Sequence, residues 1–549
     1  MEICAKEEVP RESNVSVLSF ADVARFLRNC WPRLLAISFA VITPCLWHSH
    51  IEAGDLPSHV YNAWLVHFIK TGPAPGLWLA RRSNNVLFDH VLSGLGKVVG
   101  WGAADKIATC GAVLIFFWGA FALVCAMTRR PPWFFLPCLA MVAYGWTFEM
   151  GFMNCYISIG LACFGLAILV RGRGWERGLA AALAPLVWLA HPMGLALLAT
   201  VGVYVVLAEH LPLRHRLYLF ITSVLLLVGV HFFIQVHYPS NTVFWRTEPH
   251  LVQDGFNQLL LYGPKYLLPA RLFRAFLWAC LLVDLVRQRH TPRWWSPYLL
   301  PSELYAISLV GVVLLPAYIV TRLFNQIGFH AVDALPLRLT TVSAILVCCL
   351  LCAINPQKWH LVGFSVVAVI FFFFLYHDTA KINHTEDQLD GLVCNIPPGQ
   401  RVVATIATFP SDWVTTTHII DRACIGHCIS YANYEPATGQ FRVRANFGNS
   451  FVMTDNQQIH AVYNGNYVVQ ARDLPLFEIY QCDLRTAALC VRELAVGDKA
   501  CSAVTKRSRT WVARFNGTSL LFDLLLAPVI IVGAGSGRWL IARLKQGKR

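Results

Sequence analysis

Charged residues are scarce in this sequence. Asp, Glu, Lys and Arg make up 14% of the 549 residues, whereas a soluble globular chain typically carries about 25%. A soluble surface needs charge to stay in solution, so this composition excludes an ordinary cytosolic enzyme. We also expect no cleavable signal peptide, because residues 1–33 mix acidic and basic side chains and no small-residue cleavage site follows the first apolar run.

Several motifs of soluble enzymes are missing as well. The sequence holds no Rossmann glycine fingerprint, no P-loop and no Gly-x-Ser-x-Gly elbow. The glycine-rich run 533–537 follows an apolar span rather than a strand, which indicates a flexible exit from the membrane. The net charge of +14 does not indicate nucleic acid, since no basic patch is interleaved with stacking aromatics. We therefore expect no nucleic-acid partner.

Long apolar runs are what the sequence has in abundance. Hydrophobic residues make up 56% of it, and its mean hydropathy is +0.51. A membrane helix needs about 20 such residues, because its backbone polar groups must be satisfied internally in hydrocarbon. The run 178–209 breaks at His191-Pro192 and is interpreted as two short spans. Twelve spans are predicted in all: 34–48, 107–127, 133–151, 155–170, two in 178–209, 217–236, 272–286, 304–320, 340–354, 361–376 and 520–533.

Basic loops give these spans an orientation. With the N-terminus in the cytoplasm, every short basic loop and the basic tail fall on the cytoplasmic side, as the positive-inside rule requires. The predicted fold class is thus a polytopic α-helical membrane protein with a small β or α+β extracytoplasmic domain before the last span. We expect a bacterial inner membrane, with that domain in the periplasm. The predicted divisions are a cytoplasmic segment 1–33, a membrane domain 34–376 with a large first outer loop 48–106, an extracytoplasmic domain 377–517, and a last span and basic tail 518–549.

Cysteine usage in the 377–517 domain fits an oxidising compartment. Six cysteines lie there, an even number, so one to three disulfides are expected without a defined pairing. The alternative is a zinc site built from Cys424, Cys428, His418 and His427, although their spacing matches no common zinc pattern. The six cysteines are Cys394, Cys424, Cys428, Cys482, Cys490 and Cys501.

The segment after the first span concentrates ionisable side chains. Residues 48–62 read HSHIEAGDLPSHVYN and hold two acids and three histidines. Asp55 and His59 are four residues apart, so a helix beginning near Pro57 places them on one face. Gly54 precedes Asp55, which indicates a turn that holds the carboxylate at the helix start. Residues 86–99 mix apolar and charged side chains like a helix that lies in the membrane interface.

This layout resembles the GT-C superfamily of membrane glycosyltransferases. The resemblance covers one span, an outward Gly-Asp-x-x-x-His motif, a long first outer loop and a C-terminal domain outside. It implies transfer of a sugar from a polyprenyl-phosphate carrier to a glycan, lipid or protein acceptor on the extracytoplasmic face, with inversion. The resemblance does not extend to the 377–517 domain, including residues 432–436 (ANYEP) and 441–444 (FRVR).

Four residues are candidates for the catalytic chemistry. Glycosyl transfer needs a group that takes a proton from the acceptor, and Asp55 is the candidate base; the alternative is a helix cap. Glu52 is a second acid or metal ligand, or otherwise an exposed loop acid. His59 pairs with Asp55 or only bonds locally. Glu149 lies at the outer end of the third span, where an acid near membrane depth is a functional hypothesis by default.

Cationic and imidazole side chains on the outer side are candidates for binding the leaving phosphate. Arg338 begins a span there, and arginine offers two-pronged contact to phosphate. Arg246 and Lys265 lie in a large outer loop; the alternative for such residues is snorkelling to lipid headgroups. His191 is a further candidate, or it satisfies backbone groups freed by Pro192. No organic cofactor is expected, and a divalent metal ion is left open.

Two other functions compete with the enzyme. A transporter or flippase of lipid-linked precursors predicts broken helices with charges at mid-membrane, and the sequence shows few such charges and no repeat of half the chain. A non-enzymatic envelope assembly factor that uses its outer domain for binding leaves the acids and histidines of the first loop unexplained.

Overall fold

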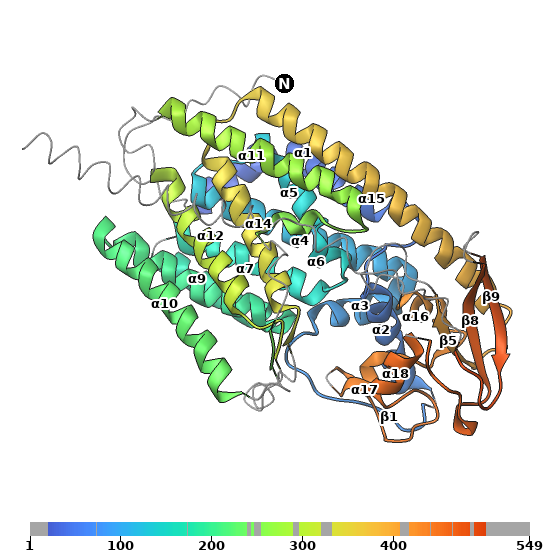
Figure 1. Ribbon diagram of the computed structural model, residues 1–549. Helices are drawn as coiled ribbons and strands as arrows, with labels where there is room; N and C mark the ends of the chain where they lie inside the picture. Colours follow the sequence, from blue (N-terminus) through green and yellow to red (C-terminus); the bar gives the residue numbers. More distant parts are fainter. Residues whose placement is uncertain are drawn as a thin grey trace, which may run out of the picture.

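The computed structural model describes residues 20–72, 74–172, 174–238, 243–245, 254–288, 296–319, 332–406, 417–439, 441–463, 465–483 and 488–500. Eight helices in these ranges are long and apolar enough to cross a membrane, and they gather in one bundle (Figure 1). This confirms the prediction of a polytopic α-helical membrane protein. The helices are α4 (Trp101–Thr128), α7 (Met153–Arg171), α9 (Pro192–His210), α10 (Leu213–His237), α11 (Leu267–Gln288), α12 (Ser296–Leu314), α14 (Leu335–Ala353) and α15 (Lys358–Val393).

The other predicted spans differ from this set. Helix α1 (Phe20–Ile42) carries several charges, and α8 (Trp175–Ala190) has only 16 residues. The predicted span 133–151 is not one helix but the short pieces η2 (Trp133–Phe135), α5 (Leu136–Ala143) and α6 (Trp146–Glu149). Span 520–533 lies outside the described residues. The number of twelve and the orientation remain predictions.

The expected break at His191 is present. Helix α8 ends at Ala190, and α9 begins at Pro192. His191 between them is extended, with φ −165° and ψ 135°. A residue before proline avoids the helical region for steric reasons, so the dipeptide separates the two helices.

Helix α15 is longer than predicted. The predicted span ends at residue 376, whereas the helix continues to Val393 and has 36 residues. At about 1.5 Å per residue it is about 54 Å long, well beyond the roughly 30 Å of a hydrocarbon core. Its last turns lead directly into the C-terminal domain (Figure 1).

The described residues between 394 and 500 form a small domain, here called the α/β domain. Its sheet has the order β6-β5-β8-β9, in which β5 is parallel to β6 and β8, and β8 is antiparallel to β9. Its elements are β5 (Arg401–Thr405), α16 (Ile419–Ala423), β6 (Ile429–Ser430), α17 (Tyr434–Thr438), β7 (Val443–Ala445), α18 (Asn456–Tyr463), β8 (Leu476–Asp483) and β9 (Ala488–Leu494).

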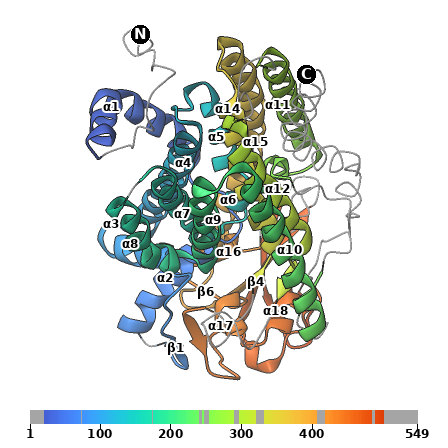
Figure 2. The same ribbon diagram turned by 90° about the vertical axis from the view of Figure 1, so that its left-hand side faces the viewer.

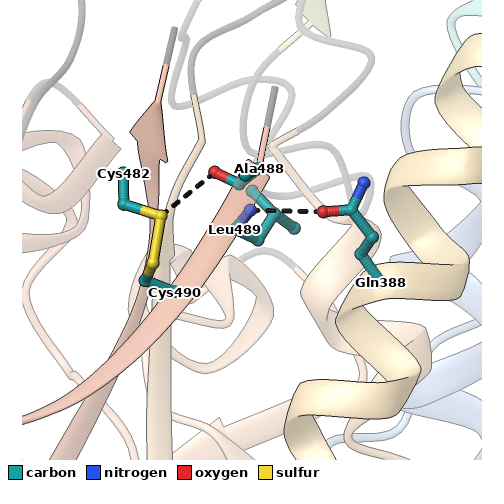
Figure 3. Close-up of a disulfide and its surroundings, with 5 residues drawn as sticks. All are labelled: Gln388, Cys482, Ala488, Leu489 and Cys490. Carbon is teal, nitrogen blue, oxygen red and sulfur yellow. Dashed lines mark hydrogen bonds between the residues drawn. A yellow bond between two sulfur atoms is a disulfide. The ribbon is translucent and has the colours of Figure 1, made fainter. Parts of the chain in front are cut away.

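One disulfide, between Cys482 and Cys490, joins β8 to β9 and confirms that this domain holds a disulfide (Figure 3). Beside it, the Leu489 N–H donates a hydrogen bond to Gln388 Oε1 of α15 (3.2 Å), so the hairpin is attached to the long helix. Cys394, Cys424 and Cys428 are free thiols. Cys501 lies outside the described residues.

The first loop and the α/β domain are built into each other. The loop contains α2 (Leu56–Thr71), β1 (Leu77–Leu79) and α3 (Leu87–Val99), and β1 pairs with β7 as an antiparallel ladder. Buried Tyr61 and Leu65 of α2 pack in one apolar cluster with Ile419 and Ile479. Both views show α2 beside α16 (Figures 1 and 2). A second small sheet, β2 (Val243–Phe244), β3 (Tyr318–Ile319) and β4 (Val332–Asp333), joins three loops of the helical bundle.

Candidate functional site

Asp55 is the N-cap residue of α2, but its side chain does not cap the helix. A cap requires the carboxylate to accept a backbone N–H of the first turn, and the side chain makes no such bond. Pro57, in that first turn, has no N–H to donate. The carboxylate is instead 26% exposed, with His418 Nε2 at 3.8 Å from Asp55 Oδ1. Asp55 is therefore placed for a role other than capping.

A tight backbone contact fixes Asp55 beside the turn that follows α6. The Asp55 N–H donates to Met150 O at 3.1 Å, and the Gly54 N–H donates to Glu149 O at 2.8 Å. Gly151 has a φ of 74°, and a Cβ atom there would lie 2.3 Å from the Asp55 nitrogen. Only glycine combines this backbone conformation with so close an approach.

His59 does not pair with Asp55, as one interpretation of the sequence expected. Its Nδ1 lies 2.9 Å from Asp89 Oδ1, on α3. Asp89 also accepts from Asn154 Nδ2 at 2.9 Å, and Arg442 Nη2 of the α/β domain lies 3.3 Å from it. Asp89 and His59 are both buried. The carboxylate thus joins α2, α3, α7 and the α/β domain.

The charges of Asp89 and His59 make the stability of this contact depend on pH. Burial disfavours the charge of Asp89, but Arg442 and then His59 outweigh burial and hold the pKa of Asp89 below its usual range. Burial opposes protonation of His59, and Asp89 outweighs it and raises the pKa of His59. The Asp89 contribution to stability is present above about pH 4 and is lost as pH falls; the His59 contribution is present below about pH 6.5 and is lost as pH rises through its folded pKa.

Replacing Arg442 by Met should loosen this junction. We expect the free energy of unfolding to fall by about 1–3 kcal/mol, because Asp89 remains buried with His59 and Asn154 as its partners. Thermal unfolding in detergent measures the change. Arg472→Met, at an exposed arginine of the same domain, is the matched control. Equal losses in both variants would contradict a specific role for Arg442.

Two segments without a role in the sequence analysis, 432–436 (ANYEP) and 441–444 (FRVR), lie against Asp89 and α2. Asn433, in the ANYEP segment, donates to Asn62 Oδ1 of α2 at 2.7 Å. Glu435 of the same segment is buried. Burial raises the pKa of Glu435 to about 7, with Arg442 opposing the rise and Asp89 adding to it. No local pattern in the sequence links these residues to the first loop.

Glu52 is buried rather than exposed. Its Oε1 accepts from Asn383 Nδ2 at 2.6 Å. Arg422 lies among further acids, with Nη1 at 2.8 Å from Glu386 and Nη2 at 3.4 Å from Asp105. Burial and then the charge of Glu386 raise the pKa of Glu52 well above its usual range, and Arg422 opposes them. Glu52 is thus part of a buried network that ties the loop to α4, α15 and α16.

The backbone of Glu149 lies close to Asp55, but its side chain points away from Asp55 toward Tyr262. The carboxylate is buried and accepts a hydrogen bond from the Tyr262 hydroxyl. Its backbone oxygen, rather than its carboxylate, is what contacts the Asp55 turn.

Arg338 and His191 come together next to the same turn. The Arg338 guanidinium lies 3.8 Å from the centre of the Phe152 ring, and Nη1 lies 3.5 Å from His191 Nε2. His191 Nδ1 accepts from the Met193 N–H at 3.1 Å, so the ring is neutral and its hydrogen is on Nε2. Two N–H donors therefore face each other. An anionic oxygen placed between them would accept from both.

Lys265, another phosphate-binding candidate, is bound elsewhere. Lys265 Nζ lies 2.6 Å from Asp378 Oδ1 of α15, and Asp378 also accepts from the Tyr266 hydroxyl at 3.1 Å. The charge of Lys265 is thereby matched by a carboxylate. Arg246 lies outside the described residues.

The sequence left open both a divalent metal ion and a zinc site. Within the described ranges, no group of three or more His, Cys, Asp or Glu side chains is arranged to hold a metal ion, neither at Cys424 and Cys428 nor at the acids of the first loop.

Comparison with known proteins adds no relative: no family model matches the chain, and neither a curated protein nor a solved structure matches it.

Proposed function

We propose that this chain is a membrane glycosyltransferase that moves a sugar from a polyprenyl-phosphate carrier to an acceptor hydroxyl on the extracytoplasmic face. One observation carries the proposal. A partly exposed carboxylate that caps no helix (Asp55) contacts the turn at residues 150–152, and Arg338, which faces His191, stacks on Phe152 of the same turn. A base and an anion site at one turn are what a displacement at a sugar phosphate needs.

The proposed reaction is a single displacement. Asp55 takes the proton of the acceptor hydroxyl while that oxygen forms a bond to the anomeric carbon. The bond from that carbon to the carrier phosphate oxygen breaks, and the electron pair stays on the phosphate. Arg338 and the Nε2–H of His191 donate to the phosphate as its charge grows. Attack opposite the leaving group inverts the anomeric centre.

The α/β domain supports this assignment by its position. It pairs β7 with β1 and places Arg442 and Asn433 against the helices that follow Asp55. A lid on the acceptor side would be attached in this way. A lipid-linked donor reaches such a site from the bilayer, which the apolar helices provide. We assign the domain to the periplasmic side of a bacterial inner membrane.

Arg338→Gln tests the phosphate role. In proteoliposomes supplied with a panel of polyprenyl-phosphate sugars, we expect kcat/KM for the donor to fall about 10- to 100-fold, since hydrogen bonds to charged groups contribute about 1.5–3 kcal/mol. Arg338→Lys should recover part of this loss. Arg287→Gln, at the other end of the bundle on α11, should transfer sugar at the wild-type rate.

The same assay separates the competing functions. If Arg338→Gln transfers sugar as fast as the wild type, Arg338 does not bind the leaving phosphate. No transfer with any donor, together with movement of a labelled lipid-linked precursor across the bilayer, would replace the proposed enzyme by a flippase.

A further inference from the structure

His418 is the one buried histidine next to Asp55 for which the proposed reaction has no role. It precedes α16 in the α/β domain and is 6% exposed. The sequence suggested it only as a zinc ligand with Cys424 and Cys428. In the structure it turns instead toward the first loop, and its two ring nitrogens face two different carboxylates.

The geometry is that of an imidazole between two acids. Nε2 lies 3.8 Å from Asp55 Oδ1, and Nδ1 lies 3.3 Å from Asp421 Oδ2. The other oxygen of Asp421 accepts a hydrogen bond from the Ser430 hydroxyl. Asp421 is therefore held in place by β6, and its Oδ2 forms an ion pair with the ring.

We propose that His418 is the positioning residue of Asp55: its imidazolium, backed by Asp421, holds the Asp55 carboxylate toward the acceptor in place of the missing helix cap. The inference rests on the proposed function. It also gives the α/β domain a part in the reaction centre, because the group that orients the base comes from a domain more than 350 residues along the chain.

The groups around His418 favour its charged form. Burial opposes protonation, but Asp421 and then Asp55 outweigh burial and raise the pKa of His418, with His59 of α2 opposing. The rings of Tyr434 of α17 and Tyr463 of α18 complete its surroundings, with centroids at 4.9 and 5.9 Å. The imidazolium is present below this raised pKa and is lost as pH rises through it.

The first test compares pH profiles of transfer in proteoliposomes. We expect the wild-type kcat to fall as pH rises through the His418 pKa. His418→Gln should lower kcat about 10- to 100-fold, remove that alkaline limb and leave the donor KM within about twofold. Asp421→Asn should move the limb to lower pH. His460→Gln, at an exposed histidine of α18, should match the wild type. If His418→Gln keeps the wild-type kcat and the same fall of kcat at high pH, the proposal is overturned.

The second test does not depend on activity. Hydrogen–deuterium exchange at the imidazole C2 position, read by mass spectrometry, titrates His418 in the full-length protein. Asp55→Asn should lower the His418 pKa, since it removes a nearby negative charge. An unchanged pKa would overturn the pairing even in an active enzyme. Absence of transfer by the wild type would overturn the proposed function, and the role of His418 with it, while this titration still reports whether the two side chains interact.

Discussion

In proteoliposomes, Asp55→Asn is expected to transfer sugar about 10²- to 10⁴-fold more slowly than the wild type. The amide keeps the size of the side chain but cannot accept the proton of the acceptor hydroxyl. Because Asp55 makes no capping bond and is partly exposed, the substitution removes only its ion pair with His418. We therefore expect a small change in thermal unfolding in detergent, whereas kcat collapses.

Glu493→Gln is the matched control for this experiment. It removes one carboxylate charge from an exposed position of β9 in the α/β domain and should leave transfer intact. Normal transfer by Asp55→Asn would move the base elsewhere. Glu149 and Glu52 are the remaining acids near this turn, although both carboxylates are buried.

Arg422→Met is expected to lower the free energy of unfolding by about 3–5 kcal/mol. The guanidinium lies against Glu386 and Asp105 and donates to the Ile51 backbone oxygen at 2.9 Å. Removing it leaves buried carboxylates without their arginine, in a region that already holds Glu52. Uncompensated buried charge is among the few causes of so large a loss from one substitution. Denaturant unfolding of the purified protein in detergent measures the change.

A second variant separates charge from packing in this network. Adding Glu386→Gln to Arg422→Met removes one of the stranded charges, so part of the lost stability should return. Arg472→Met, exposed on the same domain, should unfold like the wild type. If the double variant is no more stable than Arg422→Met, the loss comes from packing rather than from charge.

Local patterns predicted the membrane helices and the His191 break, because both follow from features within about 20 residues. Apolar runs predict membrane helices, and the residue before a proline avoids the helical region, which predicts the break at His191. The same holds for the place of Asp55 at the start of a helix, where the glycine, acid and proline of one turn were visible together. The disulfide was predicted only as present, since six cysteines allow many pairings.

The partners of these residues could not be predicted from local patterns. His59 lies next to Asp89, Asp89 next to Arg442, and Asp55 next to His418. Each contact depends on packing between segments far apart in the chain, and no helical or strand period records it. The acids were found because an acid near a membrane is unusual, whereas His418 lies among cysteines that suggested a metal site instead.

The first loop and the α/β domain pair with each other but are synthesised at different times. Asn62 and Asn433, which bond to each other, are 371 residues apart. At about 5–20 residues per second, the ribosome completes the second about 20 to 75 s after the first. Throughout that interval the edge of β1 and the carboxylate of Asp89 lack partners that the structure later gives them. Nascent chains arrested before residue 433 should therefore show the first loop as protease-sensitive, and full-length chains should protect it.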